Sequence, residues 1–231
     1  KPTSEFFKKY ADLIKITTLA PEMDEGYEAL RAFKKETNVL VSMGHTDANY
    51  EQAQEAIDNG IGHITHLFNA QTALQHRNPG VVGAALNNNV SVELICDTFH
   101  IHPALFSLVA KVKGDKLCLI TDCTRAGGMP DGEYELGGQT FFLNGIKCLL
   151  ADGTIAGSVL RMNDAVLNFK NNTSLAMHEV VNAASLNPAT AIGVNDKKGS
   201  IEVGKDADLV IFDENIRICK TIIGGTVRYE A

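Results

Sequence analysis

The chain has 231 residues, 45% of them hydrophobic, with 28 acidic and 21 basic residues and a formal net charge of −7. This length fits one large domain, or one domain with a small appendage, and the apolar fraction is enough for a sizeable core. The negative charge and the lack of a basic stripe with interleaved aromatic residues argue against nucleic-acid binding. No apolar run reaches the roughly 18 residues of a membrane-spanning helix, so no membrane insertion is expected.

The N-terminal sequence KPTSEFFKKY lacks both an initiating Met and the apolar core of a signal peptide. We therefore expect the chain to begin inside a longer protein. The number of cysteines is odd, no CxxC pair occurs, and most of them lie within apolar runs. This pattern indicates buried free thiols in the reducing cytoplasm. The five are Cys96, Cys118, Cys123, Cys148 and Cys219.

Strand-type and helix-type segments alternate through the first half of the chain. Strands are expected at 13–19, 38–43, 62–66, 92–96 and 116–121. Helices are expected at 23–35, 80–86 and 103–112, and another should run from a cap among residues 46–49 to the stop signal Asn59-Gly60. This alternation predicts an α/β fold in which a parallel sheet is connected by helical crossovers.

The pattern changes after Gly127. Residues 134–155 are rich in glycine and β-formers, with turn signals at Gly137-Gly138, Asn144-Gly145 and Asp152-Gly153, which predicts antiparallel hairpins. Helices are then expected at 159–169, 176–184 and 188–192, and short strands at 209–212, 218–223 and 226–229.

Four of the five expected parallel strands end in a residue capable of chemistry. These residues are His45, His66, Asp97 with His100, and Asp122. In parallel α/β folds the carboxyl ends of the strands form the ligand-binding edge. The sequence therefore predicts an active site there.

His45 and His66 occupy equivalent places in consecutive strand–helix units, and imidazoles held rigidly by adjacent strands suit a catalytic metal ion. Either histidine alone is better explained as a loop cap or a hydrogen-bonded core residue. Their equivalent placement, with Asp122 on a third strand end, favours a metal. His63 lies within its strand and is expected to be structural.

Asp122 ends the last strand of the series and precedes Gly127-Gly128. An Asp at such a place often caps a helix or pairs with a cation, but this position also suits a base for activated water. His76, Arg77 and His100 are candidates to bind an anionic ligand, although Arg77 alone would be read as a surface ion pair. The backbone amides at Asn69 and Ala70 directly follow a strand end, where they often face a ligand.

Six motifs in this order resemble the N-acetylglucosamine-6-phosphate deacetylase family of the amidohydrolase superfamily. They are Met43-Gly-His45-Thr-Asp-Ala, Thr65-His66-Leu-Phe-Asn69-Ala70, Arg77-Asn-Pro-Gly, Asp97-Thr-Phe-His100, Leu119-Ile-Thr-Asp122 and Leu150-Ala-Asp-Gly-Thr-Ile-Ala-Gly157-Ser158. Leu186-Asn-Pro-Ala189 and Gly199-Ser-Ile-Glu-Val-Gly-Lys205-Asp-Ala-Asp-Leu209 are similar to the C-terminal signature of the superfamily. The resemblance covers nearly the whole chain.

The resemblance implies a (β/α)8 metal-dependent hydrolase barrel with a small β-sandwich domain formed by the chain ends. Residues 1–194 would form the barrel portion, with a hairpin insertion near 134–155, and 195–231 the C-terminal strands of the sandwich. It implies a divalent metal, with zinc first and Fe, Mn, Co or Ni as alternatives. It also implies an amino-sugar phosphate as substrate and a homodimer.

The resemblance also assigns roles to individual residues. His45 and His66 would bind the metal and Asp122 would be the catalytic acid and base. Asn69, Ala70 and Arg77 would hold the phosphate, His100 the sugar, and the loop of Ala156, Gly157 and Ser158 would lie close to the substrate.

Two departures from the family pattern affect this expectation. The family carries a metal-binding glutamate upstream of the stretch that matches 13–22, so the chain is expected to be the C-terminal portion of a longer protein and to hold only the second part of the barrel. The residues on either side of Asp97, Cys96 and Thr98, and the pair Cys123-Thr124 after Asp122 differ from those usual in the family. These differences affect the expected detail of the sugar pocket. Alternative functions are another amidohydrolase, of the dihydroorotase or adenine deaminase kind, or a non-catalytic fragment.

Overall fold

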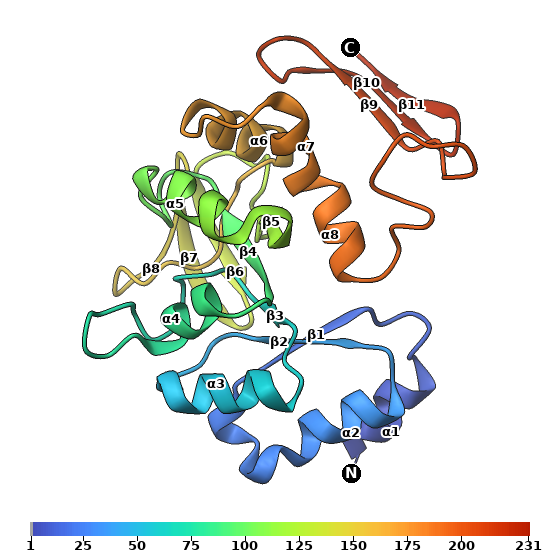
Figure 1. The fold of residues 1–231 in the computed structure, drawn as a ribbon. Coiled ribbons are helices and arrows are strands. Elements are labelled where there is room, and N and C mark those ends of the chain that lie inside the picture. Colours follow the sequence, from blue (N-terminus) through green and yellow to red (C-terminus); the bar gives the residue numbers. More distant parts are fainter. Residues whose placement is uncertain (1) are drawn as a thin grey trace.

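The computed structural model describes residues 2–231, and its first half is organised around a five-stranded parallel sheet (Figure 1). The strands are β1 (Ile16–Leu19), β2 (Leu40–Met43), β3 (His63–Ile64), β4 (Ser91–Ile95) and β5 (Leu117–Ile120). Their order in the sheet is their order in the chain, and every neighbouring pair is parallel. The predicted parallel sheet with helical crossovers is confirmed. Four of its strands are shorter than the predicted runs, whereas β4 keeps the predicted length and begins one residue earlier, at Ser91.

Helices connect these strands and cover one face of the sheet. They are α2 (Glu28–Glu36), α3 (Tyr50–Asn59), α4 (Gly80–Asn87) and α5 (Ala104–Lys113), and α1 (Pro2–Lys9) precedes β1. α3 begins as its sequence predicts, because Asn49 and Gln52 form a reciprocal capping box, and it ends at Gly60. The short 3-10 turns are η1 (Pro21–Met23), η2 (Glu25–Tyr27) and η3 (Gly114–Lys116).

The helix predicted over 23–35 begins only at Glu28, so the first part of that prediction is wrong. Gly26 and Tyr27 both adopt the left-handed conformation, with φ of 65° and 56°, which breaks the helical path. The carboxylate of Asp24 accepts hydrogen bonds from the amides of Ala29 and Leu30, both at 2.9 Å. Asp24 thus satisfies the free N–H groups at the start of α2 from outside the helix.

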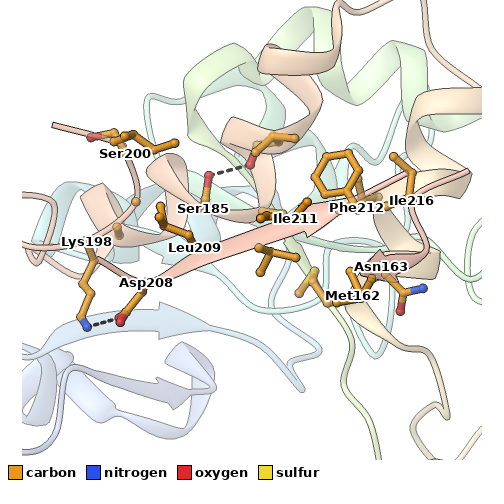
Figure 2. A pocket seen from close by; sticks show the side chains of 18 of the residues that line it. Met162, Asn163, Ser185, Lys198, Ser200, Asp208, Leu209, Ile211, Phe212 and Ile216 are labelled. Atoms are coloured by element: carbon orange, nitrogen blue, oxygen red, sulfur yellow. Dashed lines mark hydrogen bonds and ion pairs between the residues drawn. The ribbon is translucent and has the colours of Figure 1, made fainter. Parts of the chain in front are cut away.

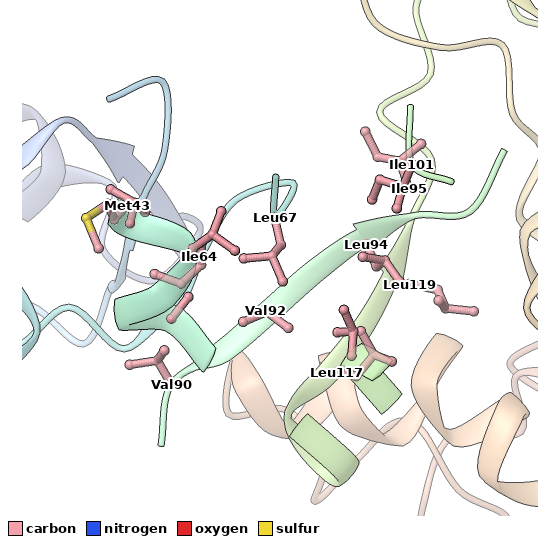
Figure 3. Close-up of a cluster of buried hydrophobic side chains, with 14 of the residues drawn as sticks. Met43, Ile64, Leu67, Val90, Val92, Leu94, Ile95, Ile101, Leu117 and Leu119 are labelled. Atoms are coloured by element: carbon pink, nitrogen blue, oxygen red, sulfur yellow. The ribbon is translucent and has the colours of Figure 1, made fainter. Parts of the chain in front are cut away.

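The main hydrophobic core lies between the sheet and its helices (Figure 3). Alternate strand residues point into this layer, among them Met43, Ile64, Val92, Leu94 and Leu119, all of which are almost fully buried. The opposite face of the sheet carries polar residues. The hydroxyl of Thr65 lies 2.6 Å from that of Ser42 and 2.9 Å from that of Thr18, which links the first three strands on that face.

A three-stranded antiparallel sheet follows the parallel sheet, as predicted for 134–155. Its strands are β6 (Gly132–Leu136), β7 (Gln139–Asn144) and β8 (Lys147–Leu150). It has a small core of its own, in which Phe141 and Cys148 are fully buried against Ala126 and Ala156. The segment that follows β8 returns to the parallel sheet, where Ser158 pairs beside Cys123.

Three helices then pack against the end of the parallel sheet. They are α6 (Met162–Asn171), α7 (Met177–Ala184) and α8 (Leu186–Ala191). Asn168 on α6 donates to the carbonyl of Cys96 at 2.9 Å, and Asn187 on α8 donates to that of Leu117 at 2.8 Å. These amide contacts anchor the helices to β4 and β5.

The chain ends in a second antiparallel sheet, which lies at the opposite end of the molecule from α1 and α2 (Figure 1). Its strands are β9 (Leu209–Phe212), β10 (Ile218–Ile223) and β11 (Thr226–Glu230). Across residues 2–231, none of the helices is both long and apolar enough to cross a membrane.

The cysteines of the described chain are all free. Cys96, Cys118 and Cys148 are buried, as expected, whereas Cys123 and Cys219 are exposed. Burial raises the pKa of the Cys118 thiol to about 12, helped by the nearby carboxylate of Glu93. Cys118 therefore behaves as an apolar core residue rather than a nucleophile.

Candidate metal centre and active site

The carboxyl ends of the five parallel strands meet at one edge, and the residues singled out in the sequence follow these ends. His45 follows β2, His66 follows β3, Asp97 follows β4 and Asp122 follows β5. The structure therefore gathers at one edge four side chains that are up to 77 positions apart in the chain.

The two histidines point at each other. Their Nε2 atoms are 2.9 Å apart, and their ring centroids are 4.7 Å apart. Gly44 makes this approach possible, because a Cβ at that position would lie 2.7 Å from the Cβ of Thr65. The Gly-His pair at the end of β2 therefore serves both close strand packing and the direction of the His45 ring.

The donor set fits a divalent metal ion. Burial lowers the pKa of His66, and the neighbouring His45 lowers it further, while the carboxylates of Asp122 and Glu93 act in the opposite direction. The neutral imidazole, which is the form that binds metals, is therefore favoured at His66. Two nitrogens that each lie about 2.0–2.1 Å from one ion can be separated by the observed 2.9 Å.

Two further observations concern how many metal-binding groups the described residues supply at this centre. The Nδ1 atom of His66 is buried without a hydrogen-bond partner in the described chain. Within residues 2–231, no three His, Cys, Asp or Glu side chains form a group that could hold a metal ion by themselves. The chain thus presents two convergent nitrogen donors.

The strand ends at this edge have unusual backbone conformations. His45, His66 and Asp122 all have positive φ, of 48°, 31° and 48°. Non-glycine residues seldom adopt this left-handed conformation, which costs about 1–3 kcal/mol per residue and clusters at functional sites. The same backbone bend after β2, β3 and β5 turns these side chains out of the strand direction.

Asp122 lies beside the loop of Ala156, Gly157 and Ser158. The amide of Ser158 donates to the carbonyl of Asp122 at 2.9 Å, and its buried hydroxyl donates to the carbonyl of Thr121. A Cβ on Gly157 would lie 3.8 Å from Oδ2 of Asp122 and 2.7 Å from the methyl carbon of Thr124. This loop therefore packs directly against Asp122, and only glycine fits at its centre, where φ is +66°.

His100 is held in place by Asp97. Its Nδ1 atom lies 2.6 Å from the Asp97 carboxylate, and both side chains are 4% exposed. Burial works against ionisation of Asp97, but the hydrogen bonds from the ring and amide of His100 and the amide of Phe99 outweigh it and lower the pKa of Asp97. The ammonium group of Lys147, on β8, lies 5.4 Å from the centre of the Phe99 ring, so the hairpin sheet borders this loop.

The residues expected to bind phosphate differ in their exposure and in how they are held. Asn69 donates to the carbonyls of His66 and Leu67, both at 3.3 Å, which holds it beside the loop that carries His66. Ala70 is exposed, has a φ of 47°, and its carbonyl accepts the amide of Thr46 at 3.1 Å. Arg77 is exposed on the following loop and makes no hydrogen bond or ion pair with another described residue.

Two carboxylates at this edge were not assigned a role from the sequence. Glu22 accepts hydrogen bonds from the hydroxyl of Thr46 and from the amide of Asp47, so it ties the ends of β1 and β2 together. Glu93 accepts from His63 and from the amide of His66. A charged residue inside the apolar run SVELI is the signal that could have drawn attention to Glu93.

An apolar pocket of about 770 Å³ lies away from this edge (Figure 2). It is formed between helices α6 to α8 and the strand β9, with Leu209, Ile211, Phe212 and Ile216 among its lining side chains. Its charged side chains are Lys198, Asp206 and Asp208, and Lys198 pairs with both carboxylates. The pocket thus offers apolar contact surface, and the groups capable of chemistry lie at the strand edge.

Comparison with known proteins identifies the family. Residues 4–228 match the model of the amidohydrolase family. The chain is 44% identical to an N-acetylglucosamine-6-phosphate deacetylase of Bacillus subtilis (strain 168), over 97% of this chain and 58% of that protein. It is 38% identical to an N-acetylgalactosamine-6-phosphate deacetylase of Escherichia coli O157:H7, over 92% of this chain and 56% of the relative.

The fold agrees as well. The crystal structure of an N-acetylglucosamine-6-phosphate deacetylase from Pasteurella multocida superimposes with a TM-score of 0.93 at 35% identity, over 98% of this chain and 60% of that one. The chain therefore spans a little over half the length of the relatives that it matches.

Proposed function

Because the chain belongs to the amidohydrolase family, we propose that this protein removes the acetyl group of N-acetylglucosamine 6-phosphate, giving glucosamine 6-phosphate and acetate. The observation that carries the proposal is the convergence of the His45 and His66 Nε2 atoms, 2.9 Å apart, at the strand edge that also holds Asp122. The similarity to deacetylases of two amino-sugar 6-phosphates supports the substrate class.

His45 and His66 would supply two protein ligands to a divalent metal. When bound, such an ion lowers the pKa of water and polarises a carbonyl group. The burial of His66, which keeps its imidazole neutral, supports the ligand role. Zinc is the first candidate because it combines readily with imidazole nitrogen.

Asp122 would act as the proton carrier. It takes a proton from the water whose oxygen attacks the acetamide carbon, and then delivers a proton to the nitrogen as the carbon–nitrogen bond breaks. The water oxygen stays with the acetate, and the proton leaves with the amine. Contact with Gly157 supports this role, because the loop at 156–158 would bring the substrate against Asp122.

Asn69, Ala70 and Arg77 would hold the phosphate, and His100 the sugar. Arg77 supports this because its guanidinium is exposed and free of partners among the described residues, and guanidinium binds phosphate well. His100 supports it because Asp97 fixes its ring, so that the other ring nitrogen is available. Binding these remote groups would orient the amide for attack.

The wider architecture follows from the same proposal. Residues 1–194 would form part of a (β/α)8 barrel and 195–231 part of a small β-sandwich domain. The protein would work in the cytoplasm as a homodimer. Free thiols throughout the described chain support a reducing compartment.

The direct test measures acetate released by the zinc-loaded full-length protein. We expect rapid release from N-acetylglucosamine 6-phosphate and little from N-acetylglucosamine, because the latter lacks the phosphate. N-acetylgalactosamine 6-phosphate is the second candidate, favoured by the Escherichia coli relative, and its rate decides between the two sugars. Hydrolysis of a cyclic amide such as dihydroorotate, with no release from either phosphorylated sugar, would overturn the proposal.

The metal centre is tested separately. His45→Ala and His66→Ala should each lower the zinc content of the purified protein, because each removes a nitrogen ligand. His102→Ala is the matched control, since His102 lies on the surface and its ring accepts the amide of the nearby Ala104. Unchanged zinc in both ligand variants would mean that the two histidines do not bind the metal.

A further inference from the structure

Glu93 is a carboxylate in the middle of β4, between two buried apolar residues, Val92 and Leu94. Its side chain is 17% exposed and points to the polar face of the sheet. The strand registers bring it level with Cys118 on β5, while Ser91, two residues earlier, is level with His63 on β3. A mostly buried carboxylate is costly for the folded state unless hydrogen-bond donors compensate for its lost contact with water.

Both oxygens of Glu93 have a partner, and both partners belong to the segment that carries His66. Oε1 lies 3.0 Å from Nε2 of His63, and Oε2 accepts the backbone amide of His66 at 3.1 Å. The main-chain carbonyl of Glu93 accepts the amide of Leu67 at 2.8 Å. One residue of β4 thus holds β3 and the bend that follows it at three points.

The bend that Glu93 holds is strained. His66 has a φ of 31°, and its residue is 5% exposed, so its amide is shielded from water. A buried amide without an acceptor costs about 1–3 kcal/mol, which would add to the cost of the left-handed backbone. The Glu93 carboxylate accepts the His66 amide and so removes the cost of an unpaired amide. It therefore allows the backbone conformation that directs the His66 ring at His45.

His63 orients the carboxylate in turn. A carboxylate oxygen can only accept, so Nε2 of His63 carries the proton in this pair. His63 is itself buried, with a side chain that is 4% exposed and no partner for Nδ1 in the described chain. The pair therefore forms a fixed unit beneath the metal-binding edge.

We propose that Glu93, oriented by His63, is a positioning residue that holds His66 in its metal-binding conformation. The inference rests on the proposed metal centre at His45 and His66. Glu93 acts through the His66 backbone, so its removal should weaken metal binding without removing a ligand. Groups one step removed from a metal ligand typically change metal affinity by roughly 10–100-fold.

The experiment measures Zn²⁺ affinity by competition with a chelator in the full-length protein, together with the visible spectrum of bound Co²⁺. Glu93→Ala should weaken Zn²⁺ binding within that range of roughly 10–100-fold and alter the Co²⁺ spectrum, because the His66 ring loses its fixed direction. Glu93→Gln should weaken it less, since one amide oxygen can still accept the His66 N–H.

Asp24→Ala is the matched control. Asp24 also accepts two backbone amides, those of Ala29 and Leu30, but among the described residues its carboxylate has no hydrogen bond to either histidine. It should lower the thermal unfolding temperature as Glu93→Ala does and leave Zn²⁺ affinity and the Co²⁺ spectrum as in the parent. Parental Zn²⁺ affinity in Glu93→Ala would overturn the proposal.

His63→Phe keeps the proposal testable if Glu93→Ala does not fold. It preserves the size of the ring and removes the hydrogen bond to Oε1, so it should also weaken Zn²⁺ binding; parental affinity would again overturn the proposal. The outcome is distinguishable from failure of the metal centre itself. Loss of zinc in His45→Ala and His66→Ala with no change in the Glu93 and His63 variants rejects only the positioning role.

Discussion

Left-handed backbone positions occur beside both the antiparallel and the parallel sheets of this molecule, but different residue types occupy them. At the turns of the antiparallel sheets, most left-handed positions are held by glycines, such as Gly137, Gly145 and Gly224, and Ile216 is an exception. At the carboxyl edge of the parallel sheet, the left-handed positions include His45, His66 and Asp122.

The difference shows what each region is selected for. At the glycine positions of the antiparallel turns, the left-handed conformation is adopted with little strain because glycine has no Cβ. At the parallel edge a side chain is needed at the same point as the bend, so the strain is retained and must be offset by contacts such as the hydrogen bond from the His66 amide to Glu93. The first three of the following predictions test this comparison and the fourth concerns a buried charge outside the site; they run from the largest expected effect to the smallest.

Asp122→Asn should reduce deacetylation by about 10²–10⁴-fold, because the amide cannot accept the proton of the attacking water. Acetate release by protein of equal zinc content measures this. The control from the other region is Asp152→Asn, which alters an exposed turn aspartate that accepts the amide of Thr154 at 2.9 Å. Its activity should match the parent. Near-parental activity in Asp122→Asn would show that another group moves the proton.

Comparing Gly157→Ala with Gly153→Ala separates the effect of backbone strain on stability from the effect of the 156–158 loop on activity. Both positions are left-handed, with φ of 66° and 87°, so each substitution should lower the free energy of unfolding by roughly 1–2 kcal/mol in urea titrations. Only the Cβ at 157 meets neighbours, Thr124 and Asp122. Gly157→Ala should therefore also lose most activity. Equal activity in the two variants would mean that the 156–158 loop does not shape the site.

His45→Gly and His45→Ala should both abolish high-affinity zinc binding but differ in stability. His45 is exposed, so its removal leaves no cavity, and glycine relieves the left-handed backbone that alanine retains. The metal-free glycine variant should exceed the alanine variant in free energy of unfolding by about 1 kcal/mol. Equal stability would show that the bend at His45 is not strained.

Lys113 provides a buried charge outside the proposed site. Its ammonium donates to the carbonyls of Ala85 and Asn88 at 2.9 and 2.7 Å, and burial lowers its pKa to about 8, with Lys116 adding to the effect. Between that value and the ordinary 10.5, the unfolded chain binds more protons than the folded one. The free energy of unfolding should therefore rise with pH across this window.

The same measurement in Lys113→Met isolates this contribution. Urea titrations at about pH 7 and about pH 9.5 should show a smaller rise in the variant, because the titrating group is gone. Zinc affinity at neutral pH should be unchanged, since Lys113 lies on α5, away from the strand ends. An undiminished pH dependence would assign the effect to other groups.

Much of the strand edge could be predicted from the sequence, because short apolar runs that end in Gly-His, Thr-His or Thr-Asp mark both the strands and their chemistry. The His45 and His66 rings meet as expected. The start of α2 could not be predicted, since it depends on the left-handed pair at Gly26 and Tyr27. The Glu93–His63 contact joins residues 30 positions apart on adjacent strands, and it depends on a register that periodicity does not give.

The order of the parallel strands also bears on how the chain reaches its fold. Paired residues in neighbouring strands are only 21 to 28 positions apart, as in Ser42 with His63 and His63 with Ser91. Each strand can therefore pair with the one that leaves the ribosome just before it. Connections of this length close at a modest entropic cost, because that cost grows only slowly with loop length. The two-residue strand β3 has a neighbour already in place before β4 emerges, so the bend that carries His66 completes only when Glu93 arrives.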